Sequence, residues 1–144
     1  MAQNTSPIFA LTPDIGSVRL VASSSARDGS TQSVSGLFLA GPSGSRVESV
    51  TFTTATTGQT TANTALVGRL YYAPTTGAAQ SNLRLLQEVA IAAVTPSVSA
   101  IGATQTMFFP GGLILPSGTS LSCSISAYAG IQDATDVIAR AGDY

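Results

Sequence analysis

The chain has 144 residues and a formal net charge of −1, and it contains no histidine and no tryptophan. All six of its basic residues are arginine, and charged residues make up only 9 % of the chain, against about 25 % in ordinary globular domains. The scattered arginines argue against a nucleic-acid partner, which needs clustered basic residues, and the missing histidine and lysine exclude the usual nucleophile–base pairs of enzymes.

The first thirteen residues carry too little alternation for a core strand. We predict that Met1–Pro13 is an extended arm and that residues 14–144 form one domain, which is long enough to bury its own core. Ile8, Phe9 and Leu11 of the arm are expected to dock on a neighbouring subunit; the alternative is a partly ordered terminus. No basic stretch precedes a long apolar run, so no secretory signal is expected, and no segment has the ~20 apolar residues of a membrane span.

Helix signals are nearly absent from the rest of the chain. Short strand signals recur at even spacing, separated by glycine, proline, asparagine and aspartate, which is typical of a β-sandwich or barrel. In chain order the predicted strands are Ser17–Ala22, Ser33–Ala40, Val47–Thr54, Ala65–Ala73, Leu83–Ala93, Thr104–Phe109, Leu113–Leu115, Thr119–Ala127 and Asp136–Ala141.

The segment Leu83–Ala93 has two interpretations. Its alternation predicts a strand with apolar residues on one face, whereas Asn82 could cap a short helix that runs to Val89. We favour the strand because the residues that follow continue as extended chain. The apolar residues predicted to share a face are Leu83, Leu85, Val89 and Ile91.

Alternation is clearest in Thr119–Ala127, where serines at every second position face away from Leu121, Cys123 and Ile125. Cys123 is therefore predicted to be a buried core thiol rather than a nucleophile. As the single cysteine of the chain, it cannot form an internal disulfide, so the fold does not depend on an oxidising compartment.

Three predicted strands carry consecutive large apolar residues, namely Leu37-Phe38-Leu39, Leu70-Tyr71-Tyr72 and Met107-Phe108-Phe109. A strand of a two-layer sandwich has one inward face, so some of these side chains must point outward. They are either scattered surface residues or residues buried against further copies or a partner subunit, and the low charge favours burial. The predicted contact residues are Leu70, Tyr72, Phe108 and Phe109.

Carboxylates are the remaining candidates for chemistry, but a glycosidase cleft usually carries aromatic sugar platforms and this chain has no tryptophan. Asp133-Ala-Thr-Asp136 could offer two ligands to calcium, yet it lacks EF-hand spacing and is interpreted as a solvated turn before the last strand. We predict no enzymatic activity, no cofactor and no metal.

Two binding functions are alternatives. Exposed Tyr71, Tyr72 or Tyr128 could stack on glycans. The short repeats Thr51-x-Thr53 and Thr54-x-Thr56 are similar to threonine arrays that bind ice, although threonine is common on any exposed strand.

The C-terminal half, roughly residues 66–144, contains five segments with a recognisable pattern, namely Arg84–Ile91, Thr95–Ser97, Met107–Phe109, Gly112–Leu121 and Asp136–Tyr144. In these segments it resembles small virion proteins of tailed bacteriophages, in particular jelly-roll head decoration (cement) and head–tail accessory proteins. Its Leu-x-Leu-Pro-x-Gly-x-x-Leu hairpin is also similar to that of trimeric jelly rolls of the tumour-necrosis-factor type.

The resemblance implies an all-β, single-domain, jelly-roll-like β-sandwich of about eight antiparallel strands with an extended N-terminal arm. It also implies a structural protein that is made in the bacterial cytoplasm and oligomerises, as a homotrimer, on the capsid surface. There it would bind the major capsid protein and stabilise the head. A tail, neck or fibre component is the alternative within the virion, and a glycan-binding module is the alternative outside it.

Overall fold

The computed structural model describes residues 12–30, 33–56, 65–75, 82–95, 102–127 and 133–144. In these ranges the chain forms eight strands and no α-helix, so none of the described residues belongs to a helix able to cross a bilayer. The strands are β1 (Thr12–Leu20), β2 (Ser35–Leu39), β3 (Ser45–Thr56), β4 (Leu66–Ala73), β5 (Arg84–Ile91), β6 (Thr104–Leu115), β7 (Ser120–Ile125) and β8 (Asp133–Asp143).

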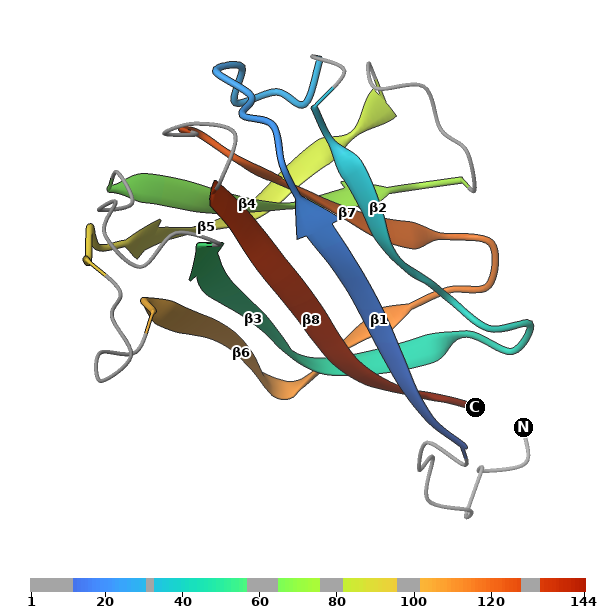
Figure 1. Cartoon of the computed structure of the whole chain (residues 1–144). Coiled ribbons are helices and arrows are strands. Elements are labelled where there is room, and N and C mark those ends of the chain that lie inside the picture. Colours follow the sequence, from blue (N-terminus) through green and yellow to red (C-terminus); the bar gives the residue numbers. More distant parts are fainter. Residues whose placement is uncertain (1–11, 31–32, 57–64, 76–81, 96–101, 128–132) are drawn as a thin grey trace, which may run out of the picture.

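The strands form two four-stranded sheets, ordered β1-β8-β3-β6 and β2-β7-β4-β5, that pack face to face (Figure 1). Every pairing between neighbouring strands is antiparallel. Among the described strands only β4 and β5 are consecutive in the chain and share a sheet; each other step crosses to the opposite sheet. This arrangement is a double-sheet jelly roll, which confirms the predicted fold class.

The core lies between the two sheets and is built by alternate residues of each strand. Leu121, Cys123 and Ile125 of β7 are at most 1 % exposed and point inward, as the alternation predicted. Val50 and Phe52 of β3 meet them from the opposite sheet. Successive strand side chains point to opposite faces, so this burial also decides which residues of β3 and β7 face outward.

The predicted strands at 104–109 and 113–115 are one strand, β6. Its pairing with β3 shifts register midway, where Gly111 and Gly112 have φ angles of +82° and +79°. Glycine adopts this region readily because it has no Cβ. The extra residues therefore bulge from the sheet without ending the strand.

The first strand starts earlier than predicted. β1 begins at Thr12, and Thr12 and Pro13 pair with Asp143 and Gly142 of β8, so two residues assigned to the arm lie in the sheet. Thr-Pro-Asp has a low local propensity for strand, so it is the pairing with β8 that holds these residues in the extended conformation.

The strand interpretation of β5 is confirmed, but its apolar residues do not share one face, and that prediction was wrong. A register shift in the pairing with β4 breaks the alternation. Val89 and Ile91 pack in or against the main core, whereas Leu83 packs beside Tyr71 on the outer side and Leu85 is the ladder partner of Tyr71.

Gly68 of β4 lies against the ring of Phe52 in the facing sheet. A Cβ at position 68 would stand 2.8 Å from Cδ1 of Phe52, and Phe52 is fully buried. We expect Gly68→Ala to lower the free energy of unfolding, measured by urea denaturation, by about 2 kcal/mol, because the added methyl group overpacks the core. Gly36→Ala is the matched control: a Cβ there meets nothing within 4 Å, so a change below about 0.5 kcal/mol is expected. Equal losses in both variants would contradict this packing.

Candidate interaction face

The outer face of the β1-β8-β3-β6 sheet carries large apolar side chains in contact with solvent. Ile15 is 67 % exposed, Phe108 72 %, Ile114 65 % and Ile138 42 %. They come from β1, β6 and β8, and each alternates with a residue that points into the core. We call this surface the outer β1–β6 face.

The pairing register fixes how these residues lie relative to one another. Ile15 and Phe108 stand at opposite ends of one row across the sheet, with Arg140 and Ser49 between them. Strands are about 4.8 Å apart, so this row is about 14 Å long. Ile138 lies in the neighbouring row, two residues along β8 from Arg140. The exposed apolar groups therefore extend across the whole width of the sheet.

Threonines occupy the β3–β6 half of the outer β1–β6 face. The hydroxyls of Thr51 and Thr106 lie 3.0 Å apart, and Thr104 donates a hydrogen bond to Thr53 at 3.3 Å. Because these hydroxyls satisfy one another, a partner could cover them at a smaller desolvation cost than ionised groups would require. Thr54 is buried and faces inward, so the second threonine repeat considered for ice binding does not extend this array.

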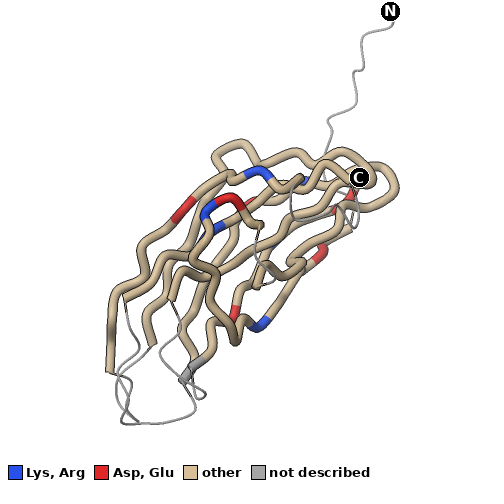
Figure 2. The backbone as a smooth tube through the Cα atoms, turned by 90° about the horizontal axis from the view of Figure 1, so that it is seen from above, with Lys and Arg blue, Asp and Glu red and all other residues tan. Residues whose placement is uncertain are grey.

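Charged residues are sparse along the whole chain (Figure 2), and those on the strands of this sheet include Arg19, Arg46, Glu48, Asp136 and Arg140. Arg19 donates two hydrogen bonds to Asp136, at 2.7 and 2.9 Å, and these bonds lower the pKa of the Asp136 carboxyl. Arg46 and Arg140 form no ion pair with another described residue. The Nε of Arg46 is buried without an acceptor among the described residues. No carboxylate of the described residues therefore neutralises the Arg140 guanidinium.

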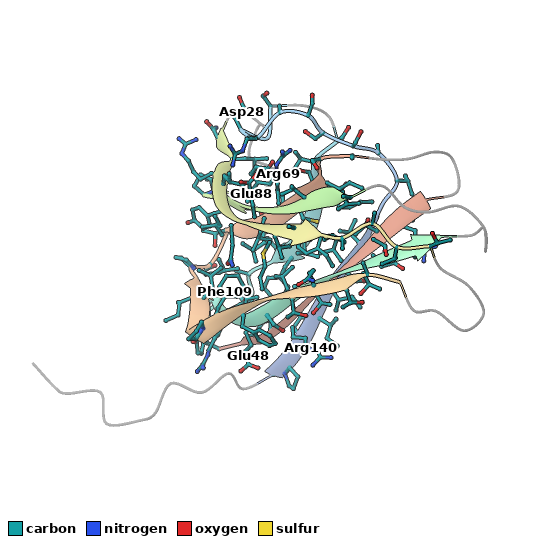
Figure 3. The ribbon with its side chains drawn as sticks, turned by 90° about the vertical axis from the view of Figure 1, so that its left-hand side faces the viewer. Asp28, Glu48, Arg69, Glu88, Phe109 and Arg140 are labelled. Carbon is teal, nitrogen blue, oxygen red and sulfur yellow. The ribbon has the colours of Figure 1, made fainter. Side chains whose placement is uncertain are left out.

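On the other sheet, the chain's own β1–β2 connection covers the outer side of β4, while Leu39 and Leu86 on the edge strands stay exposed. Arg69 of β4 donates from Nη1 to the carbonyl of Ser24 at 2.9 Å and from Nε to Glu88 at 3.0 Å. Arg27 of the connection donates to the same carboxylate. Glu88 thus joins the connection to the sheet, on the opposite side of the sandwich from Glu48 and Arg140 (Figure 3). We call Arg27, Arg69 and Glu88 the arginine clamp.

The clamp seals a second small core. Beneath the connection Tyr71 is fully buried, with its hydroxyl 3.2 Å from the Ser124 hydroxyl, and Leu83 and Val34 pack beside it. The outward member of Leu70-Tyr71-Tyr72 is therefore buried by the same chain. Its burial needs no partner subunit.

The tyrosines considered for glycan stacking are not available as platforms in the described residues. Tyr71 is fully buried, and Tyr72 is half-buried and packs against the core. Tyr128 lies outside the described residues. The described surface therefore gives no support to glycan binding through these rings.

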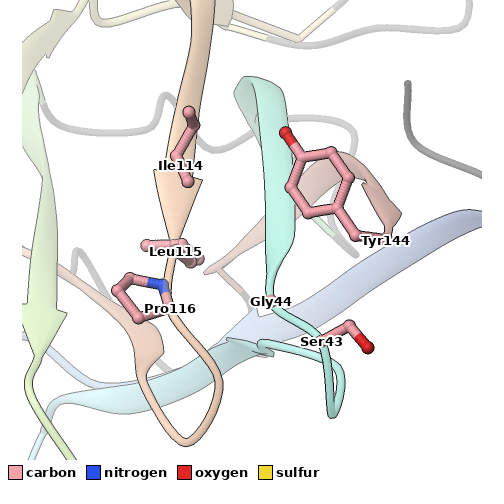
Figure 4. Close-up of a pocket in the computed structure, with 6 residues that line it drawn as sticks. All are labelled: Ser43, Gly44, Ile114, Leu115, Pro116 and Tyr144. Carbon is pink, nitrogen blue, oxygen red and sulfur yellow. The ribbon is translucent and has the colours of Figure 1, made fainter. Parts of the chain in front are cut away.

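A pocket with a volume of about 310 Å³ lies at one end of the outer β1–β6 face (Figure 4). Its walls come from the turn before β3, the end of β6 and the residue after β8. Tyr144 donates its backbone N–H to the carbonyl of Gly44 at 3.2 Å, which fixes two of these walls relative to each other. The residues that line it are Ser43, Gly44, Ile114, Leu115, Pro116 and Tyr144.

The predicted contact residues are placed differently by the structure. Phe108 is exposed on the outer β1–β6 face, whereas Leu70 is fully buried in the core, so its side chain faces this chain and not a partner. Tyr72 and Phe109 are half-buried against the core. Leu70 and Tyr72 lie on the side of β4 that faces the core, and Phe109 lies at the bulge in β6. Ile8, Phe9 and Leu11 lie outside the described residues.

Sequence reasoning missed Ile15, Ile114 and Ile138. A signal was present for Ile138, because it stands between Val137 and Ala139 as another apolar residue in an apolar run. Ile15 lies between the predicted arm, which ends at Pro13, and the first predicted strand, which begins at Ser17. Ile114 lies in a predicted strand of only three residues. Their outward orientation depends on the true extent of β1 and β6.

The Cys123 side chain is fully buried, and burial in apolar surroundings raises its pKa to about 12. Only the thiolate reacts with thiol reagents. At pH 8 we expect a disulfide reagent to modify the folded chain at least about 1,000-fold more slowly than the chain in denaturant. Rapid labelling of the folded chain would contradict the buried position.

No group of three histidine, cysteine, aspartate or glutamate side chains in the described part of the chain could hold a metal ion. Asp136 is engaged by Arg19, and Asp133 and Asp136 both belong to β8. The prediction of a turn at this point was wrong, because pairing with β3 extends the last strand to Asp133.

No protein-family model and no curated protein matches the chain. The structure of the virus-like particle of extra small virus from the giant freshwater prawn Macrobrachium rosenbergii aligns with a TM-score of 0.33 and 10 % identity, covering 99 % of this chain and 88 % of that chain. The structure of infectious bursal disease virus, Gx strain, aligns with a TM-score of 0.32 and 14 % identity, covering 100 % of this chain and 37 % of that chain. At these scores the likeness carries no argument about function.

Proposed function

We propose that this chain is a non-enzymatic structural protein of a tailed-bacteriophage virion that oligomerises and decorates the capsid, stabilising the head. In this proposal the outer β1–β6 face binds the major capsid protein. The protein is made in the cytoplasm of the bacterial host and acts on the virion surface, as a homotrimer.

One observation carries the proposal: the two outer faces of the sandwich differ. On one, the chain's own β1–β2 connection covers Tyr71, and the exposed leucines lie on the edge strands β2 and β5. The other leaves Ile15, Phe108, Ile114 and Ile138 in solvent across the width of the sheet. Exposed apolar residues spread across a sheet are typical of protein–protein contact surfaces. The resemblance of residues 66–144 to small phage virion proteins supports the choice of a virion as the place of contact.

The magnitude of this contact supports oligomerisation. Burying each of the four exposed apolar side chains gives about 1–2 kcal/mol, because a full burial gives about 1.5–3 kcal/mol. The total of about 4–8 kcal/mol is comparable to the about 4–15 kcal/mol lost on association. A single copy would therefore bind weakly, whereas linked copies gain avidity without new contacts.

Copy number tests the proposal. Purified particles are analysed by gel densitometry, with the major capsid protein as the internal standard. A decoration protein is expected in many copies, in a fixed ratio to the capsid protein. Absence from the particles would overturn a virion role, and a few copies per particle would instead indicate a tail, neck or fibre component.

A further inference from the structure

The pocket at the end of the outer β1–β6 face is suited to an apolar side chain from outside the described residues. Ile114 forms one wall and is 65 % exposed, with Pro116 and the Tyr144 ring nearby (Figure 4). A cavity of about 150 Å³ accommodates a benzene ring, so the pocket, at about 310 Å³, has room for a phenyl ring and an aliphatic neighbour.

The pocket is held in a preformed shape. Gly44 has a φ of +91°, and a Cβ there would stand 2.9 Å from the Leu115 carbonyl oxygen, so only glycine permits this approach. Ser45 donates a hydrogen bond to Asp143 at 2.5 Å and accepts one from the N–H of Gly41 at 2.8 Å, which ties the turn to β8. A ligand would therefore enter a site that needs little reorganisation.

The N-terminal segment joins the fold beside this pocket. Thr12 pairs with Asp143, Asp143 with Ser45, and Ser45 with Leu115, and the pocket residues Gly44 and Tyr144 come directly beyond that row. Residues 1–11 lie outside the described residues; their sequence contains no charged side chain. It ends in Ile-Phe-Ala-Leu, which matches an apolar pocket in chemistry.

The short length of chain between Phe9 and Thr12 favours binding of the N-terminal segment from another copy. Phe9 lies three residues before Thr12, and three fully extended residues span about 10 Å. The gap between β1 and β3 is two strand spacings, again about 10 Å. The chain's own Phe9 would therefore need full extension straight across the strand ends, whereas the segment of a neighbouring copy has no such constraint.

We infer that the pocket beside Ile114 receives Phe9 from the N-terminal segment of a second copy of this chain. The inference rests on the proposed oligomerisation and names the contact that joins the copies. Ile15, Phe108 and Ile138 of the outer β1–β6 face then remain available for the capsid.

The test uses a single fluorescent reporter in the full chain. Because the chain has no tryptophan, Phe9→Trp introduces one indole, whose emission is expected to shift to shorter wavelength as protein concentration rises. Adding Ile114→Asp should abolish the shift. Ile15→Asp is the matched control: Ile15 is equally exposed, at 67 %, but lies on β1 away from the pocket, so the shift should persist.

A mixture of two variants distinguishes binding in the pocket of a neighbouring copy from binding in the pocket of the same chain. The double variant F9W/I114D offers the indole without an intact pocket, and the full chain carrying Phe9→Ser offers an intact pocket without the aromatic side chain. The mixture is expected to show the shift that F9W/I114D alone lacks. Circular dichroism melts confirm that each variant is folded.

Two results would overturn the inference. A shift in F9W that is independent of concentration, with none in the mixture, would place the segment in its own pocket. The same spectrum for F9W and F9W/I114D at every concentration would show that Ile114 takes no part. Neither result bears on the proposed function, which is tested separately by the number of copies of the chain in purified particles.

Discussion

Replacing Phe108 and Ile138 together by serine is expected to release the protein from the particles while leaving it folded. Phe108 is 72 % exposed and lies on the edge strand β6, and Ile138 is 42 % exposed and lies on the interior strand β8 of the outer β1–β6 face. Their burial in the complex gives about 2–4 kcal/mol, so the affinity should fall by about 30- to 1,000-fold. Co-sedimentation with particles that lack the protein measures this change.

A matched pair of substitutions tests whether the effect belongs to this face. Leu39 and Leu86 are 53 % and 42 % exposed and lie on edge strands of the other sheet. Leu39→Ser with Leu86→Ser removes a similar amount of exposed apolar surface. Binding should then remain within about 3-fold of the original, since neither residue lies in the proposed contact. An equal loss in both double variants would contradict the assignment of the outer β1–β6 face.

Arg69→Met should reduce stability by about 3 kcal/mol, the largest loss expected from a single substitution outside the main core. Its side chain is 7 % exposed and donates to Glu88 and to the carbonyls of Ser24 and Ala26. Removing one partner of a buried ion pair destabilises proteins by about 3–5 kcal/mol. In Arg69→Met, Glu88 still forms its ion pair with Arg27, so we expect a loss of stability at the lower end of this range. Urea denaturation measures the loss, and a change below about 1 kcal/mol would contradict the clamp.

Acid should weaken the same clamp. Hydrogen bonds from Arg27 and then Arg69 lower the pKa of Glu88 below its usual value of 4.5. A carboxyl with a lowered folded-state pKa stabilises the fold above its unfolded pKa, and that contribution is lost as pH falls through the folded value. Glu88→Gln should therefore cost about 1–2 kcal/mol at neutral pH, and the difference from the original chain should shrink below about pH 4.5.

A pH-independent difference between the original chain and Glu88→Gln would contradict this account. Asp136 and the other carboxyls are present in both proteins, so their effects cancel in the comparison. Asp136→Asn is a suitable second control, because its partner Arg19 has a side chain that is 61 % exposed and exposed pairs contribute only about 0–1 kcal/mol.

The clamp also explains how the β1–β2 connection covers the outer side of β4. The β1–β2 connection is charge-poor except at Arg27 and Asp28, and Arg69 satisfies its inward carbonyls at Ser24 and Ala26. The connection can therefore lie on apolar Tyr71 without leaving these backbone groups unpaired. The outer β1–β6 face has no such cover among the described residues, and its large apolar side chains stay in solvent.

The alternation of apolar and polar residues was sufficient to predict an all-β sandwich, the inward residues of β7 and the buried thiol of Cys123, because strand side chains point to opposite faces at every step. It failed where pairing, not local pattern, decides the outcome. Partner strands extend β1 back to Thr12 and β8 back to Asp133, and a register shift divides the apolar face of β5.

Consecutive apolar residues likewise predicted that some side chains would face outward, but not which would stay exposed. Tyr71 and Phe108 look alike in the sequence; one is fully buried and the other is 72 % exposed. The difference arises because a connection distant in sequence covers Tyr71 through Arg69 and Glu88, and no described segment covers Phe108. Exposure depends on contacts between segments far apart in the chain, so only the tertiary structure could reveal the outer β1–β6 face.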